Sequence, residues 1–139
     1  MPSSLPVHDH LTDVTPIEIL LIEDGAGDVL LFRHALDDYP RTITVRVARD
    51  GDQALQILGE LTLNLELIVV DLNLPKISGI SVLERFGSRE VPIVIFSSSQ
   101  NAAEIEHALE LGAAEFVQKP IDLQSFRAAV RGILDKWIP

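Results

Sequence analysis

The stretch Ile17-Glu18-Ile19-Leu20-Leu21-Ile22-Glu23-Asp24 places an apolar, β-branched-rich run directly before two adjacent carboxylates. Two further runs have the same form, because Leu67-Ile68-Val69-Val70 ends at Asp71 and Ile93-Val94-Ile95-Phe96 ends at Ser97. Such near-continuous aliphatic runs are typical of parallel strands that are buried on both faces of a sheet. Because open α/β sheets bind ligands outside the carboxyl ends of their strands, we expect these polar side chains to lie together.

Strand-like and helix-like segments alternate from Pro16 to the end of the chain. The predicted strands cover residues 17–22, 43–48, 67–71, 93–97 and about 115–118. Helical patterns cover residues 28–38, the segment after 50–52, the region around 80–86, the segment from the N-cap Asn101 to Gly112, and the segment from Asp122 nearly to the C-terminus. This alternation predicts an α/β fold, a flavodoxin-like (βα)5 doubly wound sandwich with a five-stranded parallel sheet of order 2-1-3-4-5.

The overall composition narrows the class of protein. A chain of 139 residues fits one domain. Residues 1–15 are polar and Pro-punctuated, so we expect a flexible lead-in there. Residues 16–139 are expected to form a single domain without an output domain.

The formal net charge of -10 and the scattered basic residues argue against nucleic-acid binding. The chain has no cysteine, which excludes disulfides and thiolate chemistry. No bilayer-length apolar run or signal peptide is visible, so we expect a cytoplasmic protein without membrane association.

The carboxylates at the predicted sheet edge indicate a cation site. Asp71 follows the most apolar strand, where an Asp can accept a phosphoryl group as an acyl phosphate, although taken alone such a residue more often caps a turn. Glu23 and Asp24 add two negative charges that need a compensating cation. Mg²⁺ prefers oxygen ligands and usually combines one or two carboxylates with waters and a phosphate oxygen. The three carboxylates therefore favour Mg²⁺ as the cofactor over Ca²⁺, since the chain has no EF-hand pattern, although charged strand ends alone are ordinary in proteins without a metal.

Ser97 and Lys119 supply the hydroxyl and the ammonium that a transferred phosphoryl group needs. A hydroxyl stabilises charge where it accumulates, and a lysine provides a compact positive charge for a phosphate oxygen. Taken singly, each is an ordinary polar residue of a turn or surface. A nucleophilic serine is disfavoured, because the chain lacks a Gly-x-Ser-x-Gly elbow. We also consider a cis peptide bond between Lys119 and Pro120 that would aim the lysine inward.

Taken in order, these motifs resemble the receiver domain of two-component response regulators over about residues 16–137. They are Ile22-Glu23-Asp24, Asp71-Leu72-Asn73-Leu74-Pro75 followed by Gly79, Ser97, and Lys119-Pro120. The resemblance implies that Asp71 is the phosphoacceptor and that Ser97 and Lys119 contact the phosphoryl group. It implies Mg²⁺ ligands at Glu23, Asp24, Asp71 and the backbone carbonyl of Asn73. It also implies that Phe116 is a switch aromatic that turns inward when Ser97 moves to the phosphate.

Within that family, the chain is most similar to stand-alone regulators that are paired with phytochrome histidine kinases. The similarity lies in residues 20–24 together with Gly27-Asp28-Val29, in the segment from Asp71 to Pro75, and in residues 119–123. One departure is Gly25-Ala26, where those proteins often carry Asn-Pro. This change loosens the loop into the first helix but removes no group that the chemistry needs.

The resulting hypothesis is a single-domain response regulator, not an enzyme, that accepts a phosphoryl group from a sensor histidine kinase on Asp71. Phosphorylation is expected to change the surface formed by residues 101–112, 115–118 and the last helix. A homodimer through that surface, or through the last helix with its apolar stripe to Trp137, is a further candidate partner.

Two alternative functions stay open. One is a Mg²⁺-dependent phosphatase with an Asp nucleophile, although Asn73 stands where a second carboxylate would serve as general acid. The other is a pseudo-receiver that binds partners without phosphorylation, which predicts the loss of a key group that this chain retains.

Overall fold

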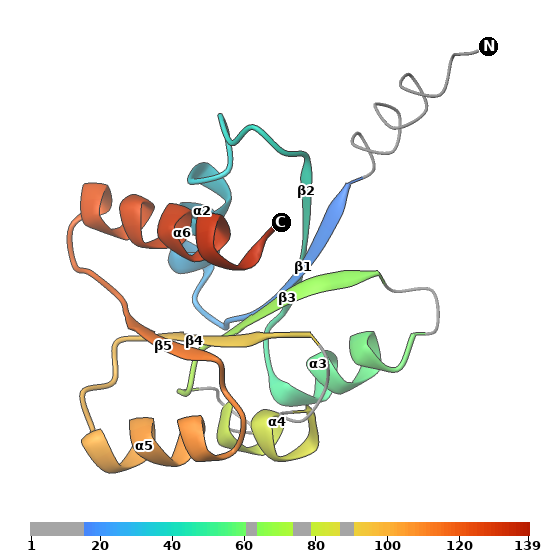
Figure 1. The fold of residues 1–139 in the computed structure, drawn as a ribbon, viewed down its shortest axis with the longest axis vertical. Coiled ribbons are helices and arrows are strands. Elements are labelled where there is room, and N and C mark those ends of the chain that lie inside the picture. Colours follow the sequence, from blue (N-terminus) through green and yellow to red (C-terminus); the bar gives the residue numbers. More distant parts are fainter. Residues whose placement is uncertain (1–15, 61–63, 74–78, 87–90) are drawn as a thin grey trace.

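The computed structural model describes residues 16–60, 64–73, 79–86 and 91–139, and its centre is a parallel sheet (Figure 1). The five strands are β1 (Ile17–Ile22), β2 (Ile43–Ala48), β3 (Leu65–Val70), β4 (Ile93–Ser97) and β5 (Glu115–Gln118). Their order in the sheet is β2-β1-β3-β4-β5, with every neighbouring pair parallel. The predicted doubly wound architecture and strand order are therefore confirmed.

Helices cover both faces of the sheet (Figure 1). One face carries α2 (Ala26–His34) and α6 (Leu123–Trp137), and the other carries α3 (Gly51–Leu58), α4 (Gly79–Phe86) and α5 (Ala102–Glu110). Alternate strand residues point to opposite faces, so Ile19 packs in one core with Phe32 of α2, and Leu20 packs in the other. Covering each strand on both sides explains why the strands are aliphatic at nearly every position.

Side-chain caps fix where three of the helices begin. Asp50, Asn101 and Asp122 each accept a hydrogen bond from the backbone N–H three residues later, at the start of α3, α5 and α6. Each cap satisfies one of the amide groups that a helix N-terminus leaves unpaired. After α5, Gly112 adopts a φ of 114°, a conformation that favours glycine. The predicted start at Asn101 and stop at Gly112 are thus confirmed.

Two predicted elements have the wrong bounds at both ends. β3 covers Leu65–Val70 rather than 67–71. It starts earlier because Leu65 already pairs with Glu18 of β1, before a shift in register between Glu18 and Ile19. α2 covers Ala26–His34 rather than 28–38, because the backbone tightens after His34 into turns with i to i+3 hydrogen bonds. The predicted lead-in at 1–15 and the Leu74-Pro75 part of the loop motif lie outside the described residues. Within the described part of the chain, no helix has the length and apolar character needed to cross a membrane.

Candidate functional site

Backbone hydrogen bonds of the sheet continue one residue beyond three of the strands and place the charged side chains. The N–H of Glu23 donates to the Ala48 carbonyl at 2.9 Å, and the N–H of Asp71 donates to the Ile22 carbonyl at 3.0 Å. The N–H of Lys119 donates to the carbonyl of Ser97 at 2.9 Å. Each residue therefore leaves the sheet at a position fixed by its neighbouring strand, and the three side chains meet at one edge.

Lys119 lies at the centre of this cluster. Its Nζ lies 2.5 Å from Glu23 Oε1, 2.7 Å from Asp28 Oδ2 and 2.9 Å from Asp71 Oδ2. A lysine ammonium has three N–H donors, so each one can point to a different carboxylate. The Lys119 side chain is only 8% exposed, and a charge this buried needs such partners. Burial by itself lowers the pKa of Lys119, but the three carboxylates raise that pKa above its ordinary value, so the ammonium stays protonated.

Both oxygens of Asp71 are held by donors. Oδ1 accepts a hydrogen bond from Ser97 Oγ at 2.8 Å and another from the Asn73 N–H at 3.0 Å, while Oδ2 faces Lys119. Burial by itself raises the pKa of Asp71, but the Asn73 N–H, Lys119 and Ser97 together bring that pKa below its ordinary value. The Asp71 carboxylate is therefore ionised and fixed in orientation, which are the properties of a prepared nucleophile.

Three of the acidic residues form a set that fits a divalent cation. Glu23, Asp24 and Asp71 each offer a carboxylate oxygen, and these oxygens lie within 4.8 Å of one another. Glu23 and Asp71 are buried, whereas Asp24 is exposed. Hard oxygen donors with one side open to solvent suit Mg²⁺, which keeps several waters when it binds. The Asn73 carbonyl stays a predicted ligand, since the contact that the structure gives for Asn73 is made by its N–H.

Glu23 behaves differently from Asp71 although both contact Lys119. Burial raises the pKa of Glu23 above its ordinary value, and the hydrogen bonds from Lys119 and the Gly25 N–H offset only part of this effect. A carboxyl with a raised folded-state pKa favours folding when it is protonated, and this stabilisation is lost as the pH rises through that pKa. Without a cation, ionised Glu23 therefore lowers stability at neutral pH.

Replacing this charge tests that conclusion. In Mg²⁺-free protein, Glu23→Gln is expected to raise the midpoint of thermal unfolding at pH 7 by roughly 1–4 °C. The desolvated carboxylate charge is gone, while Lys119 keeps the charged partners Asp28 and Asp71. The gain should shrink at pH 4, which lies below the ordinary pKa of a glutamate, because the raised pKa of wild-type Glu23 favours its protonated form there. Thermal unfolding with a chelator at both pH values measures this, and Glu106→Gln on the exposed side of α5 serves as the control. A lower midpoint for Glu23→Gln at pH 7 would show that the ionised form is net stabilising.

The two predicted switch residues lie close to the same edge. The Ser97 side chain is fully buried at the end of β4. Phe116 of β5 is half-buried, pairs in register with Ile95, and packs against the core beneath α3, α4 and α5. All described peptide bonds are trans, so the hypothesis of a cis bond before Pro120 is wrong. The inward direction of Lys119 instead accompanies its backbone bond to Ser97 and its three carboxylate contacts.

Asp28 is a member of this cluster that sequence reasoning missed. The sequence pattern places it at the start of a helix and in a stretch shared with the similar regulators, but gives it no role at the site. An acidic residue in the first turn of a helix is already explained by the helix dipole. A usable signal is its position four residues after Asp24, in the first turn of the helix that follows the sheet edge.

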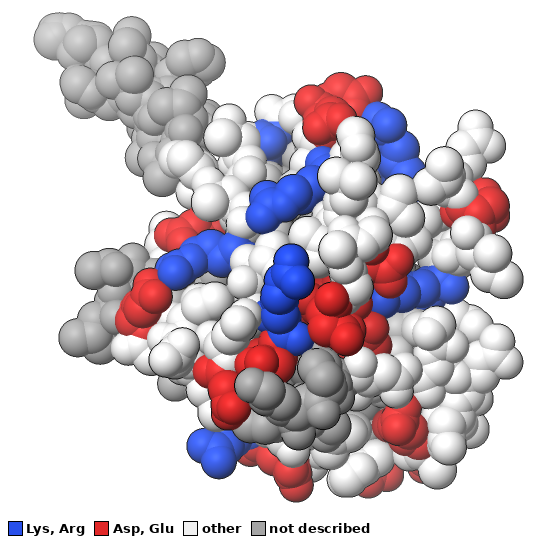
Figure 2. Space-filling view, turned by 180° about the vertical axis from the view of Figure 1, so that it is seen from behind, with Lys and Arg blue, Asp and Glu red and all other residues white. Residues whose placement is uncertain are grey.

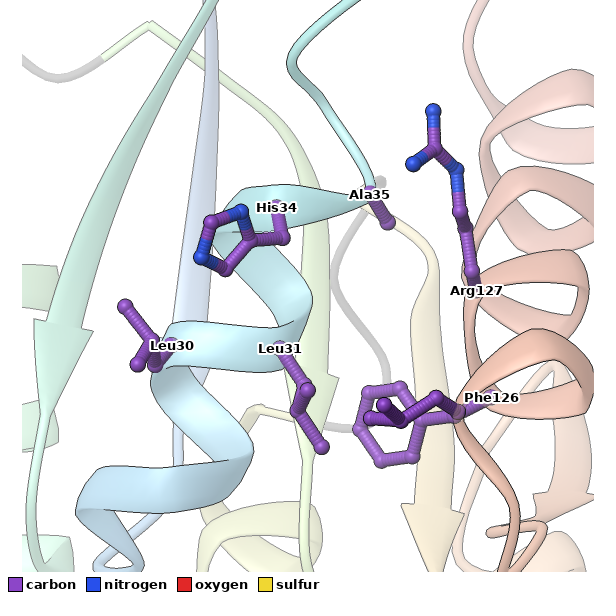
Figure 3. Close-up of a pocket in the computed structure, with 7 residues that line it drawn as sticks. Leu30, Leu31, His34, Ala35, Phe126 and Arg127 are labelled. Atoms are coloured by element: carbon purple, nitrogen blue, oxygen red, sulfur yellow. The ribbon is translucent and has the colours of Figure 1, made fainter.

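A separate hollow lies between α2 and α6 (Figure 3). It measures about 370 Å³ and is lined by Leu30, Leu31, His34, Ala35, Leu123, Phe126 and Arg127. None of the clustered carboxylates lines it, and neither does Lys119. The hollow is therefore not part of the charged cluster.

The molecular surface outside the cluster carries both signs of charge. On the face shown in Figure 2, Lys and Arg side chains are interleaved with Asp and Glu side chains rather than gathered into one basic area. Surface ion pairs of the described residues include Arg46 with Glu60 at 2.7 Å and Arg127 with Asp38 at 2.6 Å. Such exposed pairs contribute little to stability, unlike the buried contacts of Lys119.

Comparison with known proteins assigns the family. The sequence profile of the response regulator receiver domain matches residues 19–131. The chain belongs to the response regulator receiver family. This receiver domain is 33% identical over 118 residues to the Regulator of RpoS from Escherichia coli strain K12, which covers 81% of the chain and 33% of that protein. The chain thus spans about a third of the length of the first curated relatives it matches.

Two solved response regulator structures are similar to this receiver domain over nearly the whole length of their chains. The phosphorylated cyanobacterial phytochrome response regulator RcpA has 32% identity and a TM-score of 0.83, covering 89% of this chain and 95% of RcpA. The Mn²⁺-bound form of response regulator Rcp1 has 29% identity and a TM-score of 0.82, covering 88% of this chain and 95% of Rcp1. The predicted resemblance to phytochrome-associated response regulators is therefore confirmed.

Proposed function

We propose that this receiver domain is a phosphorylation switch in which Asp71 accepts a phosphoryl group from a phosphohistidine of a sensor histidine kinase. The observation that carries the proposal is the state of Asp71, an ionised carboxylate held by Ser97, Asn73 and Lys119 beside a set of cation-binding oxygens. The similarity to RcpA, solved in a phosphorylated form, supports the same use of the site.

In the proposed reaction, a carboxylate oxygen of Asp71 attacks the phosphorus atom. A phosphorus–oxygen bond forms as the phosphorus–nitrogen bond to the kinase imidazole breaks, and the bonding electrons leave with the imidazole. Glu23, Asp24, Asp71 and the Asn73 carbonyl would hold Mg²⁺, which neutralises charge on the transferred group. Lys119, whose ammonium lies beside Asp71, contributes a second positive charge for the oxygens of the transferred phosphoryl group.

The proposed switch starts with Ser97, whose hydroxyl donates to Asp71 Oδ1 in the unphosphorylated site. Once that oxygen carries phosphorus, the hydroxyl is expected to donate to a phosphoryl oxygen instead. Its movement lets Phe116 turn inward and repacks the surface of α5, β5 and α6. The altered surface would then meet another protein or a second copy of the chain.

Ser97→Ala tests the link between the chemistry and this surface. We expect Asp71 labelling to remain, with its rate reduced roughly 10-fold or less, because Ser97 stabilises the phosphoryl group but does not accept it. The phosphorylation-dependent change in hydrogen exchange of α5 and β5 should be lost. Ser97→Thr keeps the hydroxyl and should retain the change. A full response in Ser97→Ala would rule out the hydroxyl as the trigger.

The kinase partner is proposed to be a phytochrome histidine kinase. The basis is the similarity to RcpA and Rcp1 together with the shared sequence around Asp71 and Lys119. Phosphotransfer from each histidine kinase of the same genome tests this pairing. Fastest transfer from a kinase of another class would contradict the phytochrome pairing while leaving the switch intact.

Labelling of the wild-type protein with acetyl phosphate separates the switch from its two alternatives. A switch takes up at most one phosphoryl group per chain, and a chelator prevents the uptake. A phosphatase would release phosphate continuously from a phosphomonoester such as p-nitrophenyl phosphate. A pseudo-receiver would remain unlabelled. We expect the first result, since Asn73 replaces the general acid that turnover requires and the phosphoacceptor cluster is complete.

A further inference from the structure

We propose that Asp28 is a positioning residue for Lys119, which it keeps beside Asp71 when a divalent cation and a phosphoryl group engage the other two carboxylates. The inference rests on the proposed function and names one more residue on which the site depends. It starts from the contact between Lys119 Nζ and Asp28 Oδ2 at 2.7 Å.

The three partners of Lys119 are not equivalent. Glu23 and Asp71 also belong to the set of oxygens that fits a cation, whereas Asp28 does not. Their side chains are 6% and 9% exposed, while that of Asp28 is 38% exposed and reaches Lys119 from the first turn of α2. Lys119 thus has two partners that it must share with a cation and one that it does not share.

A cation and the ammonium compete for the shared carboxylates. A divalent ion bound by Glu23 and Asp71 would bring two positive charges close to Lys119 and withdraw electron density from two of its acceptors. Asp28 offsets the repulsion, because it holds a negative charge against the ammonium outside the cation set. With Asp28 neutralised, Lys119 would depend wholly on Glu23 and Asp71, and a cation would have to displace it from both.

The chain offers a matched control for the other possible roles of this charge. Asp52 lies in the first turn of α3, as Asp28 lies in the first turn of α2, and it is exposed. Neutralising either residue removes one negative charge and one favourable interaction with a helix N-terminus. Only Asp28 contacts Lys119, so a difference between the two variants reports on that contact.

The test is Mg²⁺ binding to the full chain, measured by titration calorimetry without a phosphodonor. Asp28→Asn is expected to weaken Mg²⁺ affinity roughly 5- to 10-fold, whereas Asp52→Asn should change it less than about 2-fold. Asp28→Glu keeps the carboxylate and should recover most of the affinity. In a Lys119→Met background, Asp28→Asn should change the affinity less than about 2-fold, because the residue acts through the ammonium.

A second readout follows the ammonium itself. In ¹⁵N-labelled protein saturated with Mg²⁺, we expect a resolved Lys119 ammonium resonance in the wild type and its loss through faster hydrogen exchange in Asp28→Asn. An unchanged resonance would overturn the proposal, as would an equal loss of Mg²⁺ affinity with or without Lys119. These measurements need no phosphorylation, so failure of Asp71 to label would refute the proposed function without deciding the role of Asp28.

Discussion

Replacing Asp71 with asparagine is expected to abolish Mg²⁺-dependent labelling by acetyl phosphate, with a loss of more than about 100-fold. The amide oxygen of asparagine is a poor nucleophile, and an acyl phosphate cannot form on it. The substitution keeps the size of the side chain, and an oxygen remains to accept the hydrogen bonds from Ser97 and the Asn73 N–H. The expected loss is therefore chemical, with the fold retained.

The measurement must separate loss of the nucleophile from loss of cation binding, because Asp71 also belongs to the cation set. Labelling is therefore compared at several Mg²⁺ concentrations, including a large excess. Asp52→Asn removes an exposed carboxylate elsewhere and should label like the wild type. Labelling of Asp71→Asn at the wild-type level in excess Mg²⁺ would mean that another residue takes the phosphoryl group.

Lys119→Met is expected to lower the free energy of unfolding of the Mg²⁺-free protein by about 3–5 kcal/mol, the usual cost of removing one partner of a buried ion pair. The variant leaves the ionised carboxylates of Glu23 and Asp71, both buried, without the ammonium that lies 2.5 Å and 2.9 Å from them. Mg²⁺ supplies a replacement positive charge and binds the folded state, so saturating Mg²⁺ should restore part of the stability.

Denaturant unfolding with and without Mg²⁺ measures this effect. Lys136→Met is the matched control, because Lys136 pairs with Glu115 at 3.3 Å on the surface and its side chain is 58% exposed. Such a pair contributes at most about 1 kcal/mol. A loss in Lys119→Met as small as in the control, or one that Mg²⁺ does not reduce, would show that the buried carboxylates do not depend on the ammonium.

The strands could be predicted closely because burial on both faces leaves a strong pattern. β1, β2, β4 and β5 begin and end at the predicted residues. Ile19 and Leu20 of β1 illustrate why, because both side chains are fully buried, one on each face of the sheet. The start of β3 escaped prediction because Leu65 and Glu66 are only half-buried and do not extend the continuous aliphatic run.

The cluster could be predicted only in part. Glu23, Asp71 and Lys119 directly follow strands and Ser97 ends one, so parallel pairing alone brings them to one edge. The contact of Asp28 with Lys119 joins residues 91 positions apart and depends on how α2 packs, which no local pattern specifies. A cis bond before Pro120 is one hypothesis for the inward direction of Lys119, but the described bond is trans, and the direction accompanies contacts with three carboxylates.

The central claim is that the phosphoryl group resides on Asp71 as an acyl phosphate, and locating it chemically is the most direct test. After labelling of wild-type protein with acetyl phosphate and Mg²⁺, borohydride reduction converts a phosphorylated aspartate to homoserine, which peptide mass spectrometry can locate. We predict homoserine at position 71 alone, and none when the chelator is present. Homoserine at another position, or a stable phosphoester on Ser97 with Asp71 unmodified, would contradict the account.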